Sequence, residues 1–455
     1  MINPRFAALP AVLLLAACTV GPEYQAPKAA LVAHFAEGGA QPIGAASAQR
    51  WWYAFDDPLL NELVQAGLAQ NLDIQSAIAR VAEAQAAARA TGLPALIDGS
   101  ITAQSTRSGG QGVSTATAHS ATFSPSILFD LFGGARRSRE QALAALQSAE
   151  LSVGEARLAF LSSVVSTYID MRYYQEALAL TRQTAASRRE TLKLVQFQRQ
   201  AGTATELDEA LAQASLDETL ATLPALESGF HAATYAIATL LAQPVQGLST
   251  RLQRGASQPR PGSKAAVGVP ADLLRNRPDI GAAERDYAAA VAGIGVSEAE
   301  LFPSLSLSGS VTAAAANSWT FGPSLSLPVL TQGVLRANRA QAAAQAEQAR
   351  LTWQSTVLGA VEEVQAAQSD YLRNRRAVAA YRRSVGSYAR VVDLSRETHE
   401  AGTTTLIDLL ENQRSLASAQ LSLASGMRDM AASWATLQIA AGLGWALPAQ
   451  PGDRG

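Results

Sequence analysis

Several residue types and patterns that enzymes depend on are scarce in this chain. Its 455 residues include one cysteine, Cys18, and four scattered histidines without an H-E-x-x-H spacing or an i, i+4 pair. Zinc sites and metalloprotease centres are built on such spacings. Neither a G-x-S-x-G motif nor a phosphate-binding G-x-x-x-x-G-K-[ST] loop is present. We therefore predict that the chain is not an enzyme and holds no cofactor or metal.

The chain also lacks an excess of charge of either sign. Its 36 Lys and Arg against 38 Asp and Glu give a formal net charge of −2, so no nucleic-acid partner is expected. No apolar run reaches the roughly 18 residues that a membrane-spanning helix requires. Alanine and leucine are abundant within a hydrophobic content of 48 %. That composition favours closely packed helices.

The first residues have the features of a targeting segment. Arg5 is followed by an apolar stretch of signal-peptide length that ends in Leu15-Ala16-Ala17-Cys18. These four residues resemble the bacterial lipobox, in which the cysteine carries diacylglycerol and an N-acyl lipid. The alternative is an ordinary signal peptide followed by a free thiol, which is a liability in an oxidising compartment. Residues 1–17 are thus interpreted as a lipoprotein signal peptide, and Cys18 as the lipid attachment site.

The remaining chain is an internal duplication. Landmarks recur in the same order roughly 200 positions later, as fixed-period repeats do: NLDI at 71–74 and RPDI at 277–280, Leu93-Pro94 and Phe302-Pro303, FSPS at 123–126 and FGPS at 321–324, and AGT at 201–203 and 401–403. Each copy is predicted to contain a helix, a strand pair, a very long helix, a tight turn and a second long helix. The long helices follow from proline-free stretches with few glycines and with heptad-spaced apolar residues.

The predicted strands alternate strictly between apolar and small polar residues. Between 304 and 312, leucine, glycine and valine face one side, and serine and threonine face the other. Hairpins of a soluble domain also alternate, but strands of this length with small polar residues on one side are typical of transmembrane β-strands. Four strands cannot close a barrel, and lipid does not tolerate an open edge. A symmetric oligomer that pools eight or twelve strands is therefore expected.

Several stretches resemble one family. They are CTVGPEY at 18–24, WWYAFDDPL at 51–59 followed by NLDI, and LLRNRPDI at 273–280 followed by AAE and by Phe302-Pro303. They are similar to the NodT/OprM branch of the TolC-like outer-membrane efflux lipoproteins, over nearly the whole chain.

The resemblance implies an α+β membrane protein that forms a homotrimer. Four transmembrane β-strands per protomer would complete a twelve-strand barrel in the outer membrane of a Gram-negative bacterium. A long α-helical barrel would continue it into the periplasm. The implied partners are a periplasmic adaptor and an inner-membrane pump of the resistance-nodulation-division type. The implied function is a passive exit duct for drugs or small toxic compounds.

The expected organisation follows the duplication. After the signal peptide, residues 18–70 form a lipid-anchored segment and equatorial region, 246–278 a linker, and 443–455 a tail. Repeat 1 covers 71–245, with strands at about 95–106 and 119–131 and helices 135–201 and 204–243. Repeat 2 covers 279–442, with strands at about 303–313 and 319–330 and helices 334–401 and 404–441.

The two AGT turns are the candidate functional tips. Glycine suits the left-handed position that ends a helix, and threonine suits the start of the next helix. By family similarity, Gly202, Thr203, Gly402 and Thr403 would meet the adaptor.

A pair of acids follows the second tip only. Asp408 and Glu411 share a helix face above a stripe of serines, whereas Leu211 stands where the first copy would have the second acid. In the family the matching acids line a constricted mouth, so Asp408 and Glu411 are assigned to the periplasmic aperture. Acids that stabilise a helix N-terminus are the alternative. Two other roles for the whole chain stay open: the duct of a type I protein-secretion system, or a non-conducting coiled-coil scaffold.

Overall fold

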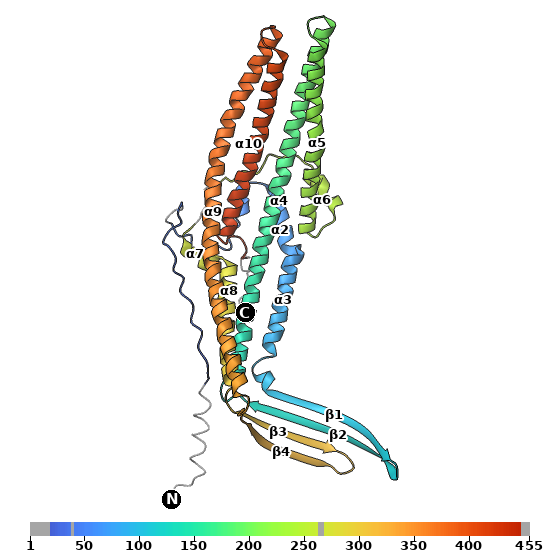
Figure 1. Ribbon diagram of the computed structural model, residues 1–455, viewed down its shortest axis with the longest axis vertical. Helices are drawn as coiled ribbons and strands as arrows, with labels where there is room; N and C mark the ends of the chain where they lie inside the picture. The colour runs from blue at the N-terminus through green and yellow to red at the C-terminus, as the bar shows by residue number, and fades with distance from the viewer. Residues whose placement is uncertain (1–18, 38–40, 263–267, 447–455) are drawn as a thin grey trace. The chain divides into compact units, whose positions relative to one another are not determined.

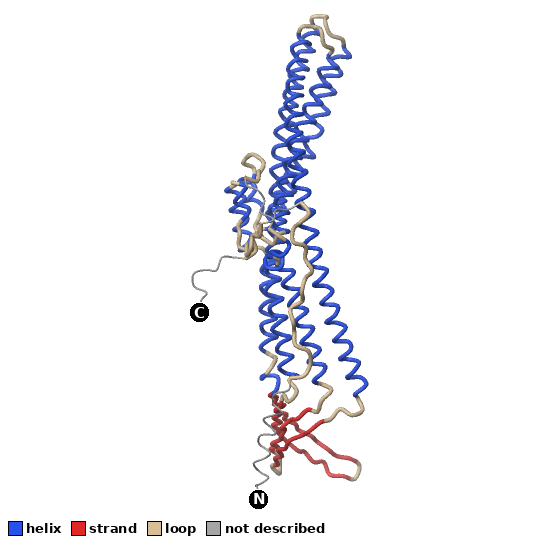
Figure 2. The backbone as a smooth tube through the Cα atoms, turned by 90° about the vertical axis from the view of Figure 1, so that its left-hand side faces the viewer, coloured by secondary structure: helices blue, strands red, loops and turns tan. Residues whose placement is uncertain are grey.

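A computed structural model describes residues 19–37, 41–262 and 268–446. These residues divide into two compact units: those described within 1–30, 77–152 and 279–357 form the first, and those described within 31–76, 153–278 and 358–455 form the second. Each unit therefore takes segments from both sequence repeats, because the long helices run on from one unit into the other. Both units contain helix, shown in blue in Figure 2, whereas the four described strands, in red, belong to the first unit.

The four strands form one antiparallel sheet in the order β1-β2-β3-β4 (Figure 1). Their bounds are β1 Ile97–Gly110, β2 Val113–Phe129, β3 Ser304–Ala313 and β4 Ser318–Ser326. The two hairpins, one from each repeat, join through the pairing of β2 with β3. The first hairpin is longer than the sequence suggested, because pairing continues to Gly110 and Val113 and leaves two residues in the connecting loop.

The register gives the sheet one apolar face and one polar face. Ile101 pairs with Phe123, Phe123 with Val311 and Val311 with Trp319, so an apolar row crosses all four strands. Hydroxyl groups form bonds between strands, from Thr122 to Thr312 over 3.0 Å and from Ser310 to Thr320 over 3.0 Å. Ile101 is 77 % exposed and Trp319 73 % exposed in the single chain. The predicted α+β class and the alternation of its strands are confirmed.

Long helices make up most of the rest, and the longest of them run through alanine-rich stretches without proline, which sustain the helical hydrogen-bond ladder. The two longest are α4 (Gly134–Gln200) and α9 (Gln332–Glu400), each followed by a shorter partner, α5 (Glu206–Leu240) and α10 (Leu406–Ala440). The remaining helices are α2 (Pro58–Gln70), α3 (Leu72–Arg89), α6 (Val245–Leu252), α7 (Pro270–Asn276), α8 (Pro278–Ala299) and the 3-10 turns η1 (Trp51–Phe55) and η2 (Leu93–Leu96). In the described ranges, no helix is long and apolar enough to cross a membrane.

Aromatic rings pack against one another in the second unit. The ring of Trp434 lies edge-on to Trp51 and to Phe55, with centroids 5.8 Å and 5.0 Å away. Trp51 is 2 % exposed and donates from Nε1 to the carbonyl oxygen of Leu443 over 3.1 Å. Such burial with a satisfied indole is typical of a packing anchor.

Two polar side chains hold the neighbouring loops of this unit. Asp272 accepts hydrogen bonds from the amides of Ile43, Gly44 and Val269. The fully buried Asn276 accepts from the amide of Ala46 and donates to the carbonyl of Gly44. The LLRNRPDI stretch and the aspartate directly before it therefore contribute buried loop anchors.

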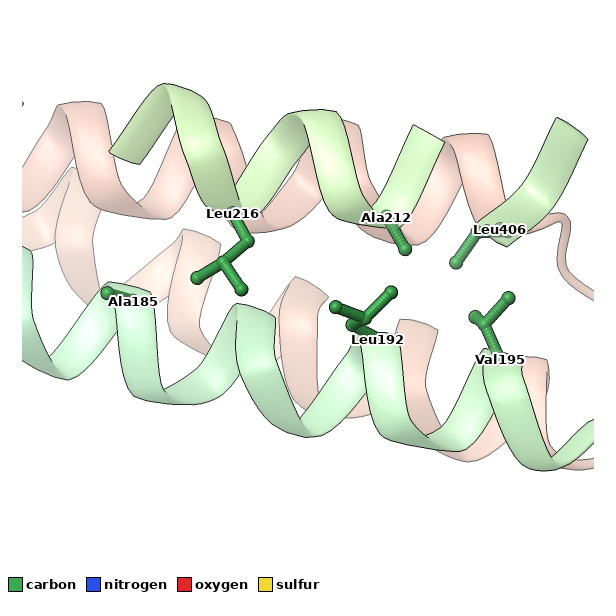
Figure 3. Packing of buried hydrophobic residues seen from close by; sticks show 6 residues of the cluster. All are labelled: Ala185, Leu192, Val195, Ala212, Leu216 and Leu406. Atoms are coloured by element: carbon green, nitrogen blue, oxygen red, sulfur yellow. The ribbon is translucent and has the colours of Figure 1, made fainter. Parts of the chain in front are cut away.

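A small apolar cluster joins the hairpins near their turns. Leu192 and Val195 of α4 pack with Ala212 and Leu216 of α5 (Figure 3). Leu406, the first residue of α10, is 6 % exposed and belongs to the same cluster. The second hairpin thus contributes to the apolar contact between the two helices of the first.

Candidate functional site

Each AGT turn closes the long helix before it in the same way. The amides of Gly202 and Thr203 donate to the carbonyl oxygens of Arg199 and Gln198 over 3.0 and 2.9 Å. Gly402 and Thr403 repeat this pattern with His399 and Thr398, over 2.9 and 2.9 Å. This is a Schellman ending, which places its glycine in the left-handed region. Gly202 and Gly402 have φ of +77° and +76°, so a side chain at either position would strain the turn.

The helix that follows each turn starts two residues later than the sequence suggested. Thr205 and Thr405 are the N-caps, and they accept from the amides of Asp208 and Asp408 over 3.1 and 3.2 Å. Thr203 and Thr403 instead donate their hydroxyls back to carbonyl oxygens of the preceding helix over 3.0 Å. The expectation that the threonine of AGT caps the next helix is therefore wrong. All four proposed tip residues are exposed.

Asp408 has a local structural partner. The hydroxyl of Thr405 donates to its carboxylate over 2.6 Å, and Thr205 makes the same bond to Asp208 over 2.7 Å. Asp208 also accepts from the backbone amide of Thr205 over 2.9 Å, and this bond, with the hydroxyl bond, holds the pKa of that carboxyl below its usual value. The alternative role of Asp408, stabilising a helix N-terminus, thus has a geometric basis. The threonine–aspartate bond that supports it occurs in both copies.

Glu411 makes the second hairpin different from the first. Its side chain is exposed and accepts from Nη2 of Arg414, one turn further along α10, over 2.7 Å. The first repeat has Leu211 and Ala214 at these two positions. The charged group on this face is therefore a Glu–Arg pair, and Asp408 and Glu411 are not bonded to each other in the structure. The assignment of both acids to an aperture stays a prediction.

The serine stripe of α10 lines a cavity of about 440 Å³ whose other walls come from α4 and α5. Ser418, Ser422 and Ser425 lie on one side of it. Arg188 lies on the other side, 5 % exposed, with a hydrogen bond to the carbonyl of Ser215 and with Glu218 at 3.6 Å. Burial lowers the pKa of the Arg188 guanidinium. The stripe therefore faces a space shared with the first hairpin, lined by both polar and apolar side chains.

The segment that follows Cys18 is fixed to the end of the sheet and the start of α4. Cys18 itself lies outside the described residues. The amide of Val20 donates to the carbonyl of Phe132 over 3.1 Å. Arg137, 6 % exposed, donates from Nε to the carbonyl of Val20 and from Nη2 to that of Gly21, over 3.1 and 3.2 Å.

Further along the same segment, Tyr24 is anchored to α8. Its hydroxyl donates to Glu284 over 2.7 Å, and the Arg285 guanidinium lies 5.4 Å from its ring centre. Burial, together with the bond to Glu284, raises the pKa of the Tyr24 phenol above its usual value.

Comparison with known proteins identifies the fold and the role together. The model of the family described as "Outer membrane efflux protein" matches residues 63–243 and 269–443. The chain belongs to this family. It is 40 % identical over 448 residues to "Nodulation protein T" of Rhizobium leguminosarum biovar trifolii, covering 95 % of this chain and 96 % of that one. It is 31 % identical to the "Pyoverdine export outer membrane protein OpmQ" of Pseudomonas aeruginosa, over 83 % of each.

A solved structure agrees with this assignment. The structure titled "Structural insights of the outer-membrane channel OprN" matches with a TM-score of 0.84 and 30 % identity, covering 94 % of this chain and all of that one. The predictions of an outer-membrane efflux protein of the NodT and OprM type are confirmed by these matches.

Some candidate functional residues of this outer membrane efflux protein were not predicted from the sequence. Arg414 stands three residues after Glu411, a spacing that could have indicated the ion pair. The Thr-x-x-Asp spacing at both helix starts could have indicated the caps. No sequence signal indicated the contacts of Arg137 with Val20 and Gly21, because these residues lie more than a hundred positions away. Over residues 19–37, 41–262 and 268–446, no group of three or more His, Cys, Asp or Glu is arranged to hold a metal ion.

Proposed function

We propose that three copies of this chain form a channel through the outer membrane, and that the channel is the exit duct of a tripartite efflux system. The observation that carries the proposal is the sheet. Its apolar face is exposed in the single chain, and β1 and β4 each have one edge unpaired among the described strands. Lipid requires a closed barrel, and three four-stranded sheets supply twelve strands.

The proposed partners act at the other end of the hairpins. A periplasmic adaptor would contact the exposed turns at Gly202, Thr203, Gly402 and Thr403. An inner-membrane pump of the resistance-nodulation-division type would supply the energy, so the chain itself serves as a passive path for drugs or small toxic compounds. Glu411 and Arg414, with Asp408 nearby, would set the charge of the periplasmic aperture.

Reconstitution of the purified full chain tests the channel. Detergent-solubilised protein should have the mass of a trimer, and it should produce stepwise ion currents in a planar bilayer. Currents that persist after the protein is heat-denatured would identify a contaminant. A trimer without current would overturn the channel in favour of a scaffold, and a stable monomer would overturn the shared barrel.

Lipidation of Cys18 is a separate part of the proposal. Radiolabelled palmitate should be incorporated into the full chain and lost from the Cys18→Ala variant. Label retained by that variant would contradict attachment at this residue. The lipid would give one anchor, and the barrel would give a second and stronger one.

A further inference from the structure

An apolar pocket lies beside the segment that follows Cys18. It has a volume of about 530 Å³, and its walls come from the strand ends, the start of α4, and the turns before and after the second hairpin of the sheet. Its apolar lining includes Leu96, Leu131, Phe132, Phe302, Pro328 and Leu335. Phe132 and Phe302 stack with their ring centres 4.6 Å apart, so the two repeats meet at this wall.

The N-terminal segment contacts Phe132 and Gly133, next to residues that line this pocket. A Cβ added to Gly133 would lie 2.5 Å from the Thr19 side chain, so Thr19 rests directly on Gly133. The residues on either side of Gly133, Phe132 and Gly134, both line the pocket. The bond from the Val20 amide to the Phe132 carbonyl fixes the chain at the same place.

The backbone of residues 19–21 approaches the neighbouring helix closely. A Cβ on Gly21 would lie 2.5 Å from the Cα of Gly295, and the φ of Gly21 is +89°. Gly295 in turn leaves room for Arg137, whose side chain would lie 2.7 Å from a Cβ there. Two glycines and one buried arginine thus hold residues 19–21 against α8 and the start of α4.

We propose that one acyl chain of the lipid on Cys18 lies in this pocket. The inference rests on the lipidation proposed above. Cys18 is joined by one peptide bond to Thr19, which contacts Gly133 between the pocket-lining Phe132 and Gly134. Apolar side chains suit the acyl chain, and the hydroxyls of Ser304, Ser326 and Thr331, which also line the pocket, suit the ester carbonyls of diacylglycerol.

This placement gives the lipid a role besides anchoring. An acyl chain held between the strand ends and α4 would support the junction where the membrane sheet meets the helices. It would also fix the attachment point relative to the sheet. A lipid that extended freely into the bilayer would do neither.

Photo-crosslinking with the native lipid tests the inference. Cells that express the full chain are fed a diazirine-bearing palmitate, irradiated, and the purified protein is mapped by mass spectrometry. Crosslinks should fall on peptides that contain 131–135, 300–304 or 328–335. Leu335→Trp, which fills the half-buried wall of the pocket, should lower these crosslinks at least several-fold. Leu330→Trp is the control, because Leu330 is 99 % exposed and is not among the lining residues.

A second variant tests the contacts that hold residues 19–21, without altering the residues that line the pocket. Gly21→Ala should keep the total lipid label and move the crosslinks away from the pocket. Gly44→Ala is its control, since Gly44 has φ of +63° but no atom within 4 Å of an added Cβ.

The outcomes separate the two proposals. Label on the chain with crosslinks confined to phospholipid or to a neighbouring subunit would overturn the pocket and leave lipidation standing. Crosslinks unchanged by both Leu335→Trp and Gly21→Ala would also overturn the pocket. Absence of label from the chain would overturn lipidation, and the pocket inference with it.

Discussion

Gln413 of α10 donates a hydrogen bond from Nε2 to the hydroxyl oxygen of Thr191 on α4, over 3.1 Å. Both side chains are 6 % exposed. The bond joins the second hairpin to the first at a buried position, in the same part of the unit where Leu406 enters the apolar cluster. It thus forms part of the connection between the two repeats.

This connection should be measurable by a double-mutant cycle. Gln413→Ala and Thr191→Val should each lower the free energy of local opening by about 1–3 kcal/mol, because each removes the buried bond between the hairpins. Thr191→Val leaves the buried Gln413 amide without this partner, whereas Gln413→Ala leaves the Thr191 hydroxyl with its bond to the Ser187 carbonyl. The double variant should lose less than the sum, by about 1 kcal/mol. Amide hydrogen exchange over 187–195 measures the effect. Gln213→Ala is the matched control, because Gln213 has the same repeat position but bonds only to the exposed Asp217.

Charge at the proposed aperture should act through Glu411 and Arg414 in opposite directions. Glu411→Gln should shift ion selectivity toward anions, and Arg414→Gln should shift it toward cations. One unit charge at 4 Å contributes about 1 kcal/mol in water, a factor of about five in preference. The reversal potential of the reconstituted channel in a salt gradient reports both shifts. Asp208→Asn, in the first hairpin, serves as the control.

The two acids can also be removed together. Replacing Asp408 and Glu411 by alanine should raise single-channel conductance and weaken block by multivalent cations. Shifts of the same sign in the Glu411 and Arg414 variants, or currents unchanged in all of them, would remove these residues from the aperture.

Gly67 of α2 should tolerate no side chain while Phe160 keeps its position. A Cβ at Gly67 would lie 2.0 Å from Cζ of Phe160, which is 3 % exposed. Gly67→Ala should therefore lower the free energy of unfolding by about 1–3 kcal/mol through overpacking. Thermal unfolding followed by circular dichroism measures it, and Phe160→Leu in the same chain should recover part of the loss.

The control for this change is Gly247→Ala. Gly247 lies within α6 with no atom within 4 Å of an added Cβ, so alanine there should stabilise the helix by about 0.5–1 kcal/mol. A loss of the same size in both variants would show that the contact with Phe160 does not decide the result.

Acid should loosen the start of α5 through Asp208. The bonds from Thr205 lower the pKa of the Asp208 carboxyl, so they stabilise the folded turn at pH values above the ordinary carboxyl pKa of about 3.9. This stabilisation is lost as the pH falls through the lowered pKa. Hydrogen exchange over 205–210, corrected for its intrinsic pH dependence, should quicken below about pH 4 in the wild-type chain.

Asp208→Asn separates the carboxyl from the rest of the turn. The variant should show no such acid transition, and at neutral pH its first turn should be less stable, with the full cap worth about 1 kcal/mol. An acid transition that persists in Asp208→Asn would assign it to another group.

The sequence determined which elements form, because each depends on residues close together in the chain. Alternating serine and leucine specified the two-faced strands, and proline-free alanine-rich stretches specified the long helices. The glycine of AGT specified the left-handed ending at 202 and 402. Even there, the prediction placed the N-cap at Thr203 and Thr403 instead of Thr205 and Thr405, since several threonines compete for one position.

Only the tertiary structure decided which side chains meet across distant segments. The contacts of Arg137 with Val20 and Gly21, and of Gln413 with Thr191, join residues more than a hundred positions apart. The axial rotation of each long helix selects such partners, and a repeating apolar pattern leaves that rotation uncertain by several residues over so many turns. The same reason explains why the sequence identified the serine stripe of α10 but not Arg188 of α4, which lines the same cavity. Composition and the period of apolar residues determine the helices and strands, and tertiary packing determines which side chains meet in the candidate site.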